Sequence, residues 1–139
     1  MVKVVCGIIV RDDGYVLIGQ RPVGKHLVGQ WEFPGGKIEL NESAEEALHR
    51  EIREELGIRI NIVYEFQCLH HTYDDGISIT MIPFVCELIN GQEKPKSLEH
   101  TTIEWVSEEQ IIENKLVAAD VVILALYRTW KLNLKQHQR

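Results

Sequence analysis

Two spacings of apolar residues alternate along this chain of 139 residues. Runs rich in β-branched residues at Val2–Val10 and 15–20 flank a turn at 12–14, and together they predict a β-hairpin. The stretch 21–36 is rich in glycine and proline and predicts a loop. Further strand patterns follow at 59–71, Ser78–Leu88 and Ile103–Val106.

The spacing becomes helical between Ser43 and Gly57, where apolar residues recur every three or four positions. Ser43 and Glu46 have the spacing of a capping box, and Gly57 suits the left-handed residue that closes a helix. A second amphipathic helix is predicted over 119–132, and a short helical turn begins at Ser107. Strands before, between and after two helices predict an α/β sandwich with a mixed sheet.

Length and composition predict one domain, 1–139, with a single core. Because the chain has neither an apolar run of about 18 residues nor a signal-peptide pattern, we expect a cytoplasmic location and no membrane partner. Three cysteines lie apart in apolar runs, so we expect buried, reduced thiols at Cys6, Cys68 and Cys86.

The charge is acidic and unevenly distributed. A net charge of −6 argues against binding to a nucleic acid polymer or an anionic membrane, because both need a basic patch. Seven carboxylates and three basic residues lie between Lys37 and Glu55, so this segment carries −4 of the −6. A helix over this segment would place Glu51, Glu54 and Glu55 on one face.

That acidic face has two interpretations. It can be an ordinary solvated surface, as on most glutamate-rich helices. However, Gly35 and Gly36 precede it and permit close backbone approach. A backbone carbonyl and several carboxylates form the hard oxygen ligand set that Mg²⁺ or Mn²⁺ prefers, and magnesium commonly binds substrate phosphates as well. The segment therefore indicates metal-assisted phosphate chemistry.

The same residues resemble a complete Nudix box, G-x5-E-x7-R-E-U-x-E-E-x-G-U with U aliphatic, over residues 36–58. The matching positions include Gly36, Glu42, Arg50, Glu51, Glu54, Glu55 and Gly57. Outside the box, Arg21, the Trp-Glu-Phe-Pro-Gly-Gly stretch, Glu99 and Trp105 resemble MutT-type nucleoside triphosphate pyrophosphohydrolases. The resemblance implies a Nudix-type α/β/α sandwich with a mixed, partly antiparallel sheet and helices on both faces.

The resemblance also implies roles for the box residues. The carbonyl of Gly35 or Gly36 and the carboxylates of Glu51, Glu54 and Glu55 would bind the metal. Glu42 would be an accessory acidic residue, and Arg50 would orient Glu51 through a charge-assisted hydrogen bond. Arg50 could instead form an ordinary surface pair with Glu54. Glu99, outside the box, would be a metal ligand or the general base, a role for which Glu51 and Glu55 compete, unless it is an unremarkable loop residue.

The implied reaction is Mg²⁺-dependent attack of water on a nucleoside triphosphate, with Mn²⁺ as a substitute metal, releasing nucleoside monophosphate and pyrophosphate. Arg21, Phe33, Tyr73 and Asp120 are the candidate substrate contacts. Each has a plainer alternative: a surface charge for Arg21, core packing for the rings and a helix cap for Asp120. Tyr73 also lies near the position where dinucleoside-polyphosphate members keep a tyrosine.

Asp120 stands where 8-oxo-dGTP-specific members have an asparagine that reads the base. An ionised aspartate only accepts hydrogen bonds and would suit the amine of cytosine, whereas a protonated one could serve an oxidised guanine. We therefore expect an 8-oxo-dGTP diphosphatase that cleans the nucleotide pool, or alternatively a (d)CTP or modified-pyrimidine pyrophosphohydrolase. A non-catalytic Nudix nucleotide-binding module is a third reading, but such modules commonly lose box carboxylates. The chain would act as a monomer or homodimer.

Overall fold

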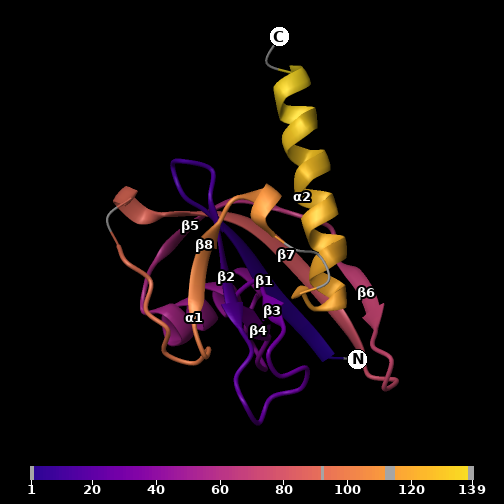
Figure 1. Cartoon of the computed structure of the whole chain (residues 1–139). Helices are drawn as coiled ribbons and strands as arrows, with labels where there is room; N and C mark the ends of the chain where they lie inside the picture. The colour runs from indigo at the N-terminus through magenta and orange to yellow at the C-terminus, as the bar shows by residue number, and fades with distance from the viewer. Residues whose placement is uncertain (1, 92, 112–114, 138–139) are drawn as a thin grey trace.

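A mixed sheet forms the centre of the molecule. A computed structural model describes residues 2–91, 93–111 and 115–137 (Figure 1). The sheet has the order β3-β2-β1-β7-β5, with β4, β6 and β8 paired to β1, β7 and β2. The strands are β1 (Val2–Val10), β2 (Val16–Gln20), β3 (Trp31–Glu32), β4 (Gly35–Lys37), β5 (Ile60–Glu65), β6 (Leu69–Thr72), β7 (Ser78–Leu88) and β8 (Ile103–Val106). β1 and β7 run parallel and the other pairs are antiparallel, as a partly antiparallel mixed sheet requires.

One helix covers each face of the sheet (Figure 1). Because strand side chains alternate between faces, Val5 and Ile9 of β1 pack with α1 (Ala44–Leu56), while Cys6 and Ile8 pack with α2 (Ala118–His137). The α/β/α sandwich predicted from the sequence is confirmed. No helix in the described part of the chain is long and apolar enough to cross a membrane.

The local signals of the first helix are confirmed. The Ser43 side chain accepts a hydrogen bond from the Glu46 backbone N–H, and the Glu46 side chain accepts one from the Ser43 backbone N–H. Gly57 closes the helix in the left-handed region at φ 67°. α2 extends beyond the predicted 119–132, and its C-terminal half projects away from the sheet (Figure 1). The helical turn predicted at Ser107 is a short 3-10 helix, Glu108–Gln110, and another, Ile89–Gly91, follows β7.

Three local expectations were wrong. The strand predicted over 59–71 is two strands, β5 and β6, and the break faces Pro83 of β7, which has no backbone N–H to donate. The loop predicted over 21–36 contains β3 and the start of β4, because its last residues pair with β2 and β1. All three cysteines are free as predicted, but Cys68 is exposed because it lies at the break between β5 and β6.

Candidate active site

A cavity of about 900 Å³ opens between the box helix, the loop after β2 and the start of α2. Its lining contains all the predicted site residues apart from Arg50 and Glu42, namely Arg21, Phe33, Gly35, Gly36, Glu51, Glu54, Glu55, Tyr73, Glu99 and Asp120. These residues come from six separate parts of the chain. The carboxylates of α1 form one group, called here the acidic end, and Phe33, Tyr73 and Asp120 form another, called here the base end.

The acidic end is built by α1 against β4. Glu51, Glu54 and Glu55 line the cavity from α1, and Glu99 joins them from the loop before β8. Gly36 lies against the Glu51 carboxylate, since a Cβ atom at residue 36 would be 2.4 Å from its Cδ. A side chain at this position would displace Glu51, so the second glycine supplies the space that the carboxylate occupies.

Arg50 lies beside this group and contacts four carboxylates, of which Glu39 is the most distant at 3.6 Å. Its Nε donates to Glu42 at 2.7 Å, and its Nη1 donates to Glu51 at 2.9 Å and to Glu54 at 3.3 Å. The guanidinium holds the pKa of Glu42 near 2. The contact needed for Arg50 to orient Glu51 is therefore present, and the Glu54 pair expected as its alternative coexists with it.

Glu55 has the least favourable surroundings of the carboxylates in the cavity. It is 4% exposed, and burial, followed by the nearby charges of Glu32, Glu51 and Glu99, raises its pKa to about 9, although a hydrogen bond with the Gly35 backbone acts in the opposite direction. Its Oε2 has no hydrogen-bond partner among the described residues. Burial also raises the pKa of Glu51, and Arg50 opposes that shift.

These groups fit a divalent cation. A buried carboxylate oxygen without a partner lies within a group of carboxylates, and the described residues place one guanidinium, that of Arg50, against them. Hard oxygen donors of this kind suit Mg²⁺ or Mn²⁺. Glu51, Glu54, Glu55 and Glu99, with the carbonyl of Gly35 or Gly36, are the groups that would hold it.

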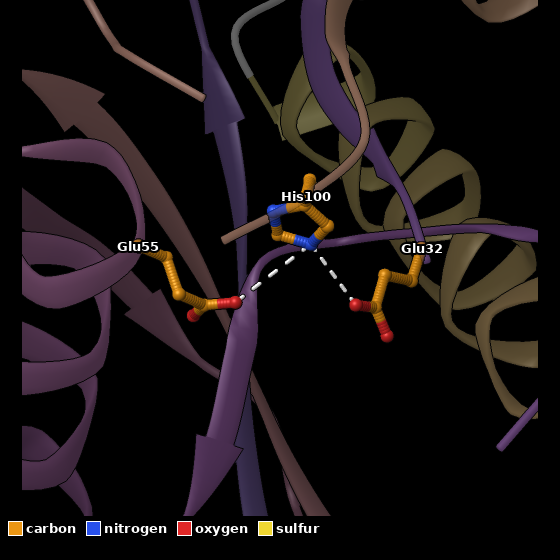
Figure 2. Close-up of side chains that lie close together, drawn as sticks. All are labelled: Glu32, Glu55 and His100. Atoms are coloured by element: carbon orange, nitrogen blue, oxygen red, sulfur yellow. Dashed lines mark hydrogen bonds and ion pairs between the residues drawn. The ribbon is translucent and has the colours of Figure 1, made fainter. Parts of the chain in front are cut away.

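The sequence did not single out Glu32 and His100. Figure 2 shows the His100 imidazole between the Glu32 and Glu55 side chains, with Nε2 lying 3.0 Å from Glu32 and 3.7 Å from Glu55. The other Glu32 oxygen accepts from Arg21 at 2.6 Å. A charged residue between Trp31 and Phe33 was a usable signal for Glu32. His100 had none, because its partners are 45 and 68 residues away in the sequence.

The base end combines aromatic rings with one buried carboxyl. Phe33 is 2% exposed, so it belongs to the core as well as to the cavity wall. The Tyr73 ring makes edge contacts with His26 and His71, at centroid distances of 5.4 and 4.6 Å, and burial raises the pKa of its phenol. The two rings named as candidate substrate contacts therefore line the cavity, as Arg21 does.

Asp120 is buried within the base end. It is 2% exposed, and burial raises its pKa to about 8, while a hydrogen bond from the Phe33 backbone lowers it. That N–H donates to Oδ2 at 2.7 Å. α2 begins two residues earlier, at Ala118, so Asp120 is not the N-cap residue of the helix. Its carboxyl connects α2 to the loop that carries Phe33.

Known proteins resemble this chain over nearly its whole length. A family model described as NUDIX domain matches residues 1–127. The CTP pyrophosphohydrolase of Escherichia coli strain K12 is 37% identical over 127 residues, 91% of each chain. The 8-oxo-dGTP diphosphatase of the same strain is 33% identical over 105 residues, 76% of this chain and 79% of its own.

Solved structures agree with the sequence relatives. The solution structure of the E. coli ORF135 protein has a TM-score of 0.78 at 33% identity and covers 94% of this chain and 91% of its own. A MutT NUDIX hydrolase from Burkholderia pseudomallei has a TM-score of 0.79 at 26% identity and covers 89% and 95% of the two chains. The intact box, the sandwich fold and these matches show that the chain belongs to the Nudix hydrolase family.

Proposed function

We propose that this protein is an Mg²⁺-dependent nucleoside triphosphate pyrophosphohydrolase. The proposal rests on the observation that the acidic end and the base end line the same cavity. The metal-bound triphosphate would occupy the acidic end, and the nucleobase would occupy the base end. The reaction adds water across one phosphoric anhydride bond and yields nucleoside monophosphate and pyrophosphate. Relatives named CTP pyrophosphohydrolase and 8-oxo-dGTP diphosphatase support this reaction class.

The acidic residues of the chain hold and orient the reacting groups. Bound Mg²⁺ supplies charge neutralisation for the triphosphate and lowers the pKa of a bound water. Glu51, Glu54, Glu55 and Glu99 would hold it, and Mn²⁺ could replace it. Arg50 fixes Glu51 and Glu54 through its charge-assisted hydrogen bonds. The carboxylate that removes the proton from the attacking water is Glu51 or Glu55, with Glu99 as the alternative.

The base end favours 8-oxo-dGTP over cytidine nucleotides near neutral pH. Asp120, with a pKa of about 8, is mostly protonated there, and a neutral carboxyl can donate one hydrogen bond and accept another. On the edge that oxidation changes, 8-oxoguanine presents an N7–H donor beside the O6 acceptor, and a neutral carboxyl can pair with both. Above the pKa, ionised Asp120 only accepts, which suits the exocyclic amine of cytosine. The (d)CTP or modified-pyrimidine activity is therefore the second candidate.

The alternative function outside the enzymes is that of a non-catalytic nucleotide-binding module. Such a module needs the cavity but not a complete acidic end. In this chain Glu51, Glu54 and Glu55 all line the cavity, and Arg50 contacts two of them. Keeping like charges together is unfavourable unless a cation compensates them. This arrangement supports the hydrolase.

The reaction class is tested with a panel of normal and oxidised nucleoside triphosphates at alkaline pH, with pyrophosphate release as the measurement. We expect release in the presence of Mg²⁺, less or equal release with Mn²⁺, and none in EDTA, because the acidic end needs a cation to accept a polyanion. Turnover that persists in EDTA, or its absence across the panel with Mg²⁺, would contradict the proposal.

Glu55→Gln should lower kcat by about 10²- to 10⁴-fold if Glu55 takes part in proton transfer or metal binding. The same change should raise the Tm of the metal-free protein at pH 8. Folded Glu55 keeps its proton up to a pKa of about 9, whereas an unfolded glutamate loses it near 4.5. Stability therefore falls as pH rises between these values, and Gln removes that loss.

Glu54→Gln is the matched control for this experiment. Glu54 is half-exposed, with 52% of its side chain accessible, so its substitution should lower activity without raising the Tm. At pH 4.5, where Glu55 is protonated in the folded protein, the Tm advantage of Glu55→Gln should largely disappear. A normal kcat in Glu55→Gln would contradict its part in proton transfer or metal binding, and no gain in Tm at pH 8 would contradict the raised pKa of Glu55.

Asp120 is tested by kcat/KM for 8-oxo-dGTP, dGTP, dCTP and 5-methyl-dCTP between pH 6.5 and 9. For the wild type, the preference for 8-oxo-dGTP over dCTP should fall as pH passes about 8, because Asp120 then loses its donor. Asp120→Asn should keep both donor and acceptor and remove this pH dependence. If the preference for 8-oxo-dGTP over dCTP changes with pH in the Asp120→Asn variant as it does in the wild type, base reading by Asp120 is ruled out.

A further inference from the structure

The imidazole of His100 occupies a space that the sheet leaves for it. His100 lies in the loop before β8, and 2% of its side chain is exposed. Its ring lies against Gly19 of β2, where a Cβ atom would be 2.5 Å from the ring Cδ2 and 2.6 Å from Cγ. Any larger residue at position 19 would push the ring away from its present place. A ring held this closely has little freedom to move.

The His100 ring lies between two carboxyl groups of the cavity wall, those of Glu32 and Glu55. Nε2 lies 3.0 Å from Oε2 of Glu32 and 3.7 Å from Oε1 of Glu55 (Figure 2). Nε2 is within hydrogen-bond distance of Glu32 and donates to that carboxylate, while Oε1 of Glu55 lies just beyond this distance. Glu32 in turn accepts from Arg21 with its other oxygen, at 2.6 Å. A continuous chain of polar contacts therefore runs from Arg21 to Glu55.

The backbone around His100 is attached at both ends. The N–H of Leu98 donates to the carbonyl of Glu55 at 3.1 Å, which ties the loop to the end of α1. The N–H of Thr101 donates to Gln20 of β2 at 3.0 Å. The Ser97 hydroxyl donates to the His100 carbonyl at 2.7 Å. The ring is thus carried by a segment anchored to the box helix and to the sheet.

We propose that His100 is a positioning residue that holds Glu55 and Glu32 in a fixed relation, and so keeps Glu55 oriented toward the acidic end of the cavity. His100 faces Oε1 of Glu55, while the buried Oε2, which has no partner among the described residues, stays available. The inference rests on the proposed function, because it assigns Glu55 to a metal-dependent site. His100 acts on that site through Glu55.

Three substitutions separate this role from simple packing. His100→Gln keeps an N–H donor at about the reach of Nε2. His100→Asn keeps the amide but is too short, and His100→Met keeps the reach but has no donor. His49→Leu, on the exposed outer side of α1, controls for loss of a histidine elsewhere. Each variant is measured for Tm, for kcat and KM with the preferred triphosphate, and for Mn²⁺ binding without substrate by electron paramagnetic resonance.

We expect His100→Asn and His100→Met to lower kcat and weaken Mn²⁺ binding by about 10- to 100-fold, the usual effect of losing a residue that orients a metal ligand, with little change in KM. His100→Gln should recover most of both quantities, and His49→Leu should resemble the wild type. If the Met variant does not fold, the Gln and Asn pair still makes the comparison. Equal effects of Gln and Asn, or wild-type values for Asn, would overturn the proposal.

Mn²⁺ binding also separates this proposal from the proposed function. A wild-type protein that binds Mn²⁺ but hydrolyses no triphosphate would refute the hydrolase, while the order of Mn²⁺ affinities among the variants would still test His100. A wild-type protein that binds no Mn²⁺ would contradict both. Hydrolysis by the wild type, together with Mn²⁺ affinities that do not distinguish Gln from Asn, would refute the role of His100 alone.

Discussion

Burial of like charges at one end of a cavity is the constraint on which this structure depends. Glu51 and Glu55 are largely removed from water, and burial is the first cause of the raised pKa of each. Arg50 compensates Glu51, Glu54 and Glu42, and among the described residues it forms no hydrogen bond or ion pair with Glu55. Such an arrangement is costly in the free protein, because each buried carboxylate must be protonated or paired. A divalent cation and a triphosphate would complete the charge balance.

The rest of the fold places the buried carboxylates and their neighbours in the cavity. The capped helix α1 presents its carboxylates beside a stripe that packs on the sheet. Gly36 leaves room for the Glu51 carboxylate, and Gly19 leaves room for the His100 ring. On the opposite face, α2 brings Asp120 to the Phe33 backbone. The two helix layers therefore fix the two ends of the cavity: α1 fixes the acidic end and α2 fixes Asp120 at the base end.

Features that depend on neighbours in sequence were predictable. The helix caps at Ser43 and Gly57, the alternation along Val2–Val10 and the spacing of the box carboxylates all follow from local periodicity. Features that depend on distant pairing were not. The break between β5 and β6 follows from Pro83 on another strand, and the place of His100 follows from a glycine 81 residues earlier. No local pattern reports such contacts.

If the proposed function is correct, a single nucleotide spans the cavity with its phosphates at the acidic end and its base at the base end. The most direct measurement is a crystal structure with a non-hydrolysable triphosphate analogue and Mg²⁺. We expect metal density among Glu51, Glu54 and Glu55, and the base beside Asp120. A nucleotide bound in the reverse direction, or bound outside this cavity, would contradict this binding mode.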